Sequence, residues 1–187
     1  MRYIFYIALL YSFPLMSQTS IYDLKVQTAY GGELRLQHLK GRKILIAVVS
    51  VENLNRKGGL ELWDSITTAN PNVACILIPA SDMDTVSNDS AAMVSVRTKT
   101  SKKLILSDVG SVRKDRGEKQ HPLMRWLTDV SQNEYFNSDV TTDQQLYVIS
   151  ESGILYAIME KGVRMAVVNE VLKSADVKPS PFGRLKR

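Results

Sequence analysis

Cysteine and histidine are scarce in this chain, and their scarcity limits the chemistry it can perform. The 187 residues include one cysteine, Cys75, and two histidines, His38 and His121. A single cysteine forms neither an intramolecular disulfide nor a Cys-x-x-Cys redox pair, and it cannot build a cysteine zinc site. Two histidines disfavour a His-rich metal centre. The sequence therefore predicts no metal ion and no cofactor.

Long apolar runs and phosphate-binding motifs are also missing. After the N-terminal segment, no stretch approaches the roughly 20 apolar residues that a membrane-spanning helix needs, so we expect no transmembrane anchor. Gly58 and Gly59 lack the lysine and hydroxyl residue that complete a phosphate-binding loop. The formal net charge is +5, but aromatic residues do not interleave with the basic ones, so nucleic acid is not an expected ligand. The partners that remain are a protein or a small molecule.

The N-terminal segment has the order of a secretory signal peptide. A positive start precedes an apolar run over residues 3–16, and small polar residues follow. We expect a signal peptide over residues 1–17 and export to a periplasmic or extracellular location. An uncleaved anchoring helix is the alternative, which Pro14 disfavours. The folded domain is expected over residues 18–175, and a basic tail over residues 176–187.

The rest of the chain is typical of one folded α/β domain. Hydrophobic residues make up 44% and charged residues 23% of the chain, as in globular proteins, and the length suits a single domain. Two nearly continuous aliphatic runs, Ile44–Val51 and Val73–Ile78, are typical of strands that are buried on both faces in a parallel sheet. Apolar residues with helical spacing follow Gly59, and Asn70-Pro71 would end that helix.

Later segments continue the alternation of helices and strands. The sequence predicts an N-terminal hairpin over residues 21–36, helices over residues 87–96, 121–130 and 163–173, and strands over residues 104–106, 145–149 and 154–159. Because helices alternate with buried strands, and the chain closes on a hairpin and a helix, the order predicts a three-layer α/β domain.

Four stretches of the sequence carry a resemblance to a known family. They are Tyr-Asp-Leu at 22–24 with Leu-Lys-Gly-Arg-Lys at 39–43, the strand that ends in Ile-Pro at 78–79, Asp-Val-Gly at 108–110 with Pro-Leu at 122–123, and Leu-Tyr-Val-Ile-Ser-Glu-Ser-Gly at 146–153. In this order and spacing they resemble the glutathione peroxidase family, over most of residues 22–163. The resemblance implies a thioredoxin-like three-layer fold, with a central mixed β-sheet and helices on both faces.

The resemblance also implies an activity and four site positions. Members of the family reduce hydrogen peroxide or organic hydroperoxides with a thiol reductant, in the oxidative stress response. Their peroxidatic cysteine or selenocysteine follows the first core strand, at a helix N-terminus that stabilises the thiolate. Here Asn53 stands at that place. The family's glutamine falls near Asp82, and its Trp-Asn pair falls on Thr142 and Asp143, so all four positions are changed.

Cys75 does not replace the missing nucleophile. It lies in the middle of the apolar run Val73–Ile78, where burial would raise the pKa of the thiol and make it inert. Two hypotheses follow. The first is a catalytically degenerate member of the family that acts as a binding or interaction module. The alternative is a thiol-dependent peroxidase, as the resemblance alone implies.

Other polar residues near these positions have open interpretations. Glu52, Asp82 and Asp143 would converge in the family's register, where they could favour a cation, or they form a scattered, solvated acidic rim. His121 precedes a proline at an expected helix start, which favours a capping or surface role. Ser50 follows a buried strand, as a catalytic serine can, but no Gly-x-Ser-x-Gly elbow surrounds it.

Overall fold

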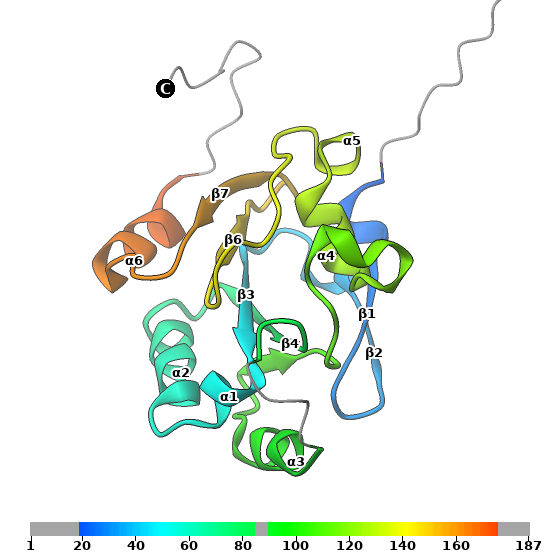
Figure 1. The fold of residues 1–187 in the computed structure, drawn as a ribbon. Helices are drawn as coiled ribbons and strands as arrows, with labels where there is room; N and C mark the ends of the chain where they lie inside the picture. The colour runs from blue at the N-terminus through cyan, green and yellow to red at the C-terminus, as the bar shows by residue number, and fades with distance from the viewer. Residues whose placement is uncertain (1–18, 85–89, 176–187) are drawn as a thin grey trace, which may run out of the picture.

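A five-stranded mixed sheet organises the chain. The computed structural model describes residues 19–84 and 90–175 (Figure 1), so the expected signal peptide over 1–17 and basic tail over 176–187 lie outside the described residues. The strands lie in the order β5-β4-β3-β6-β7. Parallel pairing joins β3 to β4 and β4 to β5, whereas β6 is antiparallel to both β3 and β7. Their bounds are β3 Ile44–Ser50, β4 Ala74–Ala80, β5 Leu104–Leu106, β6 Leu146–Ile149 and β7 Leu155–Met159.

Helices cover both faces of this sheet, as the sequence predicts, so the thioredoxin-like three-layer arrangement is confirmed. Figure 1 shows α2 and α6 on one side of the sheet, with α4 and the β1–β2 hairpin on the other. The first side comprises α1 Val51–Asn55, α2 Gly59–Ala69, α3 Ser90–Lys99 and α6 Met165–Lys173. The second side comprises η1 Ile21–Asp23, β1 Lys25–Gln27, β2 Glu33–Arg35, η2 Leu36–Leu39 and α4 Pro122–Thr128. Two short helices, η3 Lys114–Lys119 and α5 Val130–Asn133, flank α4 in the chain.

The continuous aliphatic runs explain why the two central strands are buried on both faces. Alternate side chains of a strand point to opposite sides, so Leu45 and Val49 of β3 pack with α2, while Ile46 and Val48 pack with α4. Every residue of β3 and β4 is buried. A polar residue at any of these positions would face one of the two cores.

Some expected boundaries are wrong for local reasons. The hairpin expected from Ile21 begins instead with the η1 turn, because the Ser20 side chain accepts a hydrogen bond from the Tyr22 N–H. The helix expected over residues 121–130 ends at Thr128, since Asp129 caps the following α5 with a 2.9 Å hydrogen bond from the Ser131 N–H. The helix expected from residue 87 is described from Ser90, because residues 87–89 lie outside the described part.

A glycine fixes the approach of α1 to α2 at the end of β3. A Cβ atom at Gly59 would lie 2.1 Å from the main-chain oxygen of Asn53, so any side chain there would push the two helices apart. Gly58, just before it, has a φ of 85°, a left-handed conformation that favours glycine. The Gly58-Gly59 pair therefore allows α1 and α2 to pack closely, and it sets the position of α1. Within the described residues no helix has both the length and the apolarity to cross a membrane.

Candidate functional site

The candidate site lies where β3 ends and α1 begins. Ser50 is the last residue of β3 and the N-cap of α1, and its Oγ accepts a 3.2 Å hydrogen bond from the Asn53 N–H. Such a cap satisfies one of the free N–H groups of a helix start. It places Asn53 in the first turn of α1, beside the end of the central strand.

Asp143 closes a hydrogen-bond network at this point. Its Oδ1 accepts a 2.8 Å bond from the Ser50 N–H, and its Oδ2 accepts a 2.8 Å bond from the Ser50 hydroxyl and another bond from the Asn53 side-chain amide. The next residue, Gln144, donates its N–H to the Val48 oxygen at 2.8 Å, which holds the Asp143 loop against β3. The structure thus brings Asn53 and Asp143 together across 90 residues of sequence.

Asp82 is held by a different segment. Its side chain is only 4% exposed. Its carboxylate accepts hydrogen bonds of 3.0 Å from the Val112 N–H and 3.1 Å from the Arg113 N–H, and Arg116 Nε lies 3.6 Å away. The interpretation of Asp82 as part of a solvated acidic rim is therefore wrong. The carboxylate is buried because it anchors the loop that follows β5.

Thr142 and Glu52 also have partners of their own. The Thr142 hydroxyl accepts a 3.4 Å hydrogen bond from the Lys161 N–H. Glu52 is exposed and pairs with Arg56 at 2.7 Å, one helical turn away. Among the residues that the structure describes, no group of three His, Cys, Asp or Glu side chains is placed to hold a metal ion.

Cys75 lies in the middle of β4, opposite Leu45 of β3 and Leu104 of β5. Its side chain is completely buried on the face covered by α2. Burial, with a smaller contribution from the Asp64 carboxylate, raises the pKa of the thiol to about 12. The thiolate, which is the form that attacks peroxides and disulfides, is therefore suppressed at neutral pH.

His121 is the N-cap residue of α4, as expected, but its side chain is buried. Its side chain makes no capping hydrogen bond, the residue is 8% exposed, and it packs against Gly110. Its Nδ1 is buried without a hydrogen-bond partner among the described residues. Desolvation lowers the pKa of the imidazole to about 4. The expected surface role is therefore wrong: His121 occupies the cap position, but its side chain is neutral and buried.

The arrangement at the end of β3 is a closed polar network without a thiol. The Asn53 amide and both Asp143 oxygens have partners inside it, and the Ser50 hydroxyl donates to a carboxylate rather than to an imidazole base. Such a network holds a loop and a helix start in place, and it presents hydrogen-bonding groups. The role of Ser50 as the link between Asn53 and Asp143 was not predicted, although a serine between a buried strand and a helix is a capping signal.

Comparison with protein-family models and with curated protein sequences finds no match. Comparison with solved structures gives clear similarities. The crystal structure of Trgpx in its apo form has a TM-score of 0.59 at 16% identity, over 83% of this chain and 94% of that chain. GPX1 of T. cruzi has a TM-score of 0.57 at 15% identity, over 82% and 94%.

A third similar structure is the exposed lipoprotein thioredoxin Etrx1 of Streptococcus pneumoniae. Its TM-score is 0.54 at 14% identity, over 80% of this chain and 97% of that chain. The chain has a thioredoxin-like fold. At these identities the similarity shows the fold and not the activity, because one fold carries many functions. The glutathione peroxidases and the thioredoxin share the arrangement of the sheet and helices with this protein.

Proposed function

We propose that this protein is an exported, glutathione peroxidase-like protein that has lost thiol chemistry and acts as a binding or interaction module. One observation carries the proposal: the side-chain amide of Asn53, which the sequence resemblance puts at the position of the family's peroxidatic cysteine, donates a hydrogen bond to Asp143. An amide cannot attack a peroxide. The adjacent carboxylate would also disfavour a thiolate at this place, because like charges raise a thiol pKa.

The only sulfur nucleophile in the chain supports the same proposal. Cys75 is buried in β4, and burial raises the pKa of its thiol to about 12. A peroxidase of this type needs a thiolate that attacks the O–O bond and becomes a sulfenic acid, and then a second thiol that reduces it. A second thiol would have to come from another molecule, and Cys75 is enclosed between β3 and β5.

A thiol-dependent peroxidase is the alternative function, and the similarity in fold to two glutathione peroxidases is what favours it. The two functions differ in peroxide consumption. We expect the purified protein to consume hydrogen peroxide and cumene hydroperoxide with dithiothreitol or glutathione no faster than the reductant alone. Peroxide loss would be followed by a colorimetric assay at neutral pH.

The matched control for this assay is Cys75→Ala, which removes the only thiol. We expect wild type and Cys75→Ala to give the same background rate. Wild-type turnover that Cys75→Ala abolishes would overturn the proposal and make Cys75 the nucleophile. Turnover that both proteins share would also overturn it, since the chain would then reduce peroxide by a group other than its thiol.

Export is the second part of the proposed function. Its basis is the charged, apolar and then small polar order of residues 1–20, which is typical of a signal peptide. We expect the exported chain to begin near Gln18. N-terminal sequencing of protein collected outside the cytoplasm measures this directly, and a chain that retains Met1 in the cytoplasmic fraction would contradict it.

A further inference from the structure

A pocket lies at the opposite end of the central strands from the candidate site. Ser50 ends β3, whereas the pocket surrounds the residues that precede β3 and β4, Lys43 and Val73. Since β3 has seven residues, the two places are separated by the strand's length of about 20 Å. The cavity has a volume of about 890 Å³, within the range of small-molecule sites.

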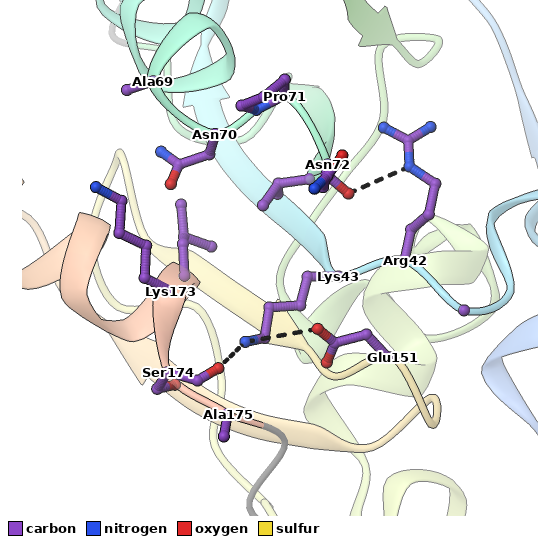
Figure 2. Close-up of a pocket in the computed structure, with 13 residues that line it drawn as sticks. Arg42, Lys43, Ala69, Asn70, Pro71, Asn72, Glu151, Lys173, Ser174 and Ala175 are labelled. Atoms are coloured by element: carbon purple, nitrogen blue, oxygen red, sulfur yellow. Dashed lines mark hydrogen bonds and ion pairs between the residues drawn. The ribbon is translucent and has the colours of Figure 1, made fainter.

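Segments that are distant in sequence form the walls of this pocket. They are the turn before β3, the end of α2 with the turn that follows it, the β6–β7 turn and the end of α6. Figure 2 shows their side chains gathered around one space, with Lys43 and Glu151 on one side and Asn70 to Asn72 on the other. The pocket is therefore formed by the packing of separate segments of the chain and not by one loop.

Lys43 is a buried cation in the wall of the pocket, and it connects three of the segments that form it. Its side chain is 5% exposed, and its Nζ donates a hydrogen bond to the main-chain oxygen of Ser174 and lies 3.7 Å from Glu151 Oε1. A buried charge needs such partners. Lys43 thereby joins the start of β3 to the end of α6 and to the β6–β7 turn. Its partner Glu151 is the single carboxylate among the lining residues, and Glu151 Oε2 is buried without a hydrogen-bond partner in the described part of the chain.

Two further basic residues of the pocket have no carboxylate partner. Arg42 and Lys173 are both exposed, and within the described residues neither makes an ion pair. Arg42 Nε donates to the Asn72 main-chain oxygen at 3.3 Å, which holds the guanidinium at the rim and leaves its terminal nitrogens available. Figure 2 shows Arg42 and Lys173 on opposite sides of the pocket, with Asn70 and Asn72 between them.

The C-terminal ends of α2 and α6 do not cancel the positive charge of Arg42 and Lys173. Helices α2 and α6 both end here, and a helix C-terminus carries a partial negative charge on its free carbonyl groups. The Asn70 side-chain amide donates to the Ile66 oxygen at 2.9 Å, and Lys43 donates to the Ser174 oxygen. These internal bonds occupy main-chain oxygens at the two helix ends. The charges of Arg42 and Lys173 remain for a ligand.

We propose that this pocket binds a small organic dianion whose two carboxylate or phosphate groups lie at its two ends. The guanidinium fork of Arg42 matches a planar or tetrahedral oxyanion, and the Lys173 ammonium acts as a point charge for the second group. Pro71, Val73 and Leu172 among the lining residues would cover the body of such a ligand. This site is independent of the proposed function, because it does not involve Cys75, Asn53 or Asp143.

The test is a titration of the ¹⁵N-labelled full chain, followed by amide chemical shifts at constant ionic strength. The probes are succinate, with two carboxylates, fructose 1,6-bisphosphate, with two phosphates, and acetate as the single-charge control. We expect saturable shifts at the amides of Lys43, Asn72 and Lys173 with at least one of the two dianions. Which of the two binds more tightly distinguishes carboxylate from phosphate. Acetate should give only weak, unsaturated shifts.

Variants locate the binding. Arg42→Gln and Lys173→Gln should each weaken binding of the dianion by about tenfold, because each removes one charge-assisted contact. The control is Lys119→Gln, which makes the same charge change at an exposed position that does not line the pocket. It should leave the affinity within about twofold, since distant exposed charges are screened by salt.

Two results would overturn the proposal. The first is that neither dianion binds more tightly than acetate. The second is that Arg42→Gln and Lys173→Gln bind as the wild type does, which would place any binding elsewhere. Peroxide turnover in the earlier assay, with dianion binding intact, would instead remove the proposed function and leave this site in place.

Discussion

Cys75→Asp is expected to leave the protein largely unfolded at neutral pH. The side chain at this position is completely buried between β3 and β5, on the face covered by α2. A carboxylate there would lose its hydration without gaining a partner, which costs several kcal/mol. Asp64 already raises the pKa of the Cys75 thiol through its charge, and it would repel a second carboxylate as well. A domain of this size has a free energy of unfolding of only about 5–15 kcal/mol.

The control for this substitution is Cys75→Ala, which removes the sulfur without adding a charge. It should lower the free energy of unfolding by about 1–2 kcal/mol, the effect of a small cavity. Urea denaturation followed by far-ultraviolet circular dichroism measures both variants. If Cys75→Asp unfolded cooperatively with a free energy within about 1 kcal/mol of Cys75→Ala, the β4 position could not be buried as the structure has it.

The sheet and most of its helices could be predicted from the sequence, because their signals are local. The runs that become β3 and β4 have aliphatic side chains on both faces of the strand. We therefore expect both strands in the centre of a sheet whose two faces are covered. The apolar spacing after Gly59 predicted α2, and the predicted helix over residues 163–173 corresponds to α6. The two shortest α-helices escaped prediction, since the five residues of α1 and the four of α5 are too few to show a helical period.

The candidate site could be predicted only in part. The resemblance pointed to Asn53 and Asp143, but the bond between their side chains depends on how the loop before β6 returns to the end of β3. Asp82 follows β4 beside the end of β3, and its carboxylate is occupied by hydrogen bonds from the Val112 and Arg113 N–H groups. A side chain that anchors a loop and one that lines a site look alike in sequence, because both are polar residues after a strand.

Buried polar residues were the least predictable feature. Lys43 lies two residues after the turn glycine Gly41 and just before a buried strand, which is an ordinary place for an exposed lysine. Only the fold brings Ser174 and Glu151 to its ammonium group. His121 also stands at a boundary, between η3 and α4, where a surface position was expected. In both cases the side chain is covered by segments distant in sequence, so no local sequence pattern predicts its burial.

The burial of His121 should make the protein sensitive to mild acid. Its pKa is lowered from 6.5 to about 4 in the folded protein by desolvation, whereas the unfolded chain takes up the proton near pH 6.5. Between these values protonation stabilises only the unfolded state. The stabilising contribution is complete above pH 6.5 and is lost as the pH falls towards 4. Its full size is about 3 kcal/mol, because the pKa of the imidazole falls from 6.5 to about 4 on folding.

His121→Gln separates this contribution from the carboxylates that also titrate in acid. We expect the free energy of unfolding of the wild type to fall by about 3 kcal/mol more than that of the variant between pH 6.5 and 4, whatever the cost of the substitution at pH 7. An imidazole signal that stays neutral to below pH 5 by nuclear magnetic resonance is the matching observation on the wild type. If the two stability curves ran parallel, His121 would have to be solvated or paired with a carboxylate, because either environment keeps the pKa of an imidazole from falling this far.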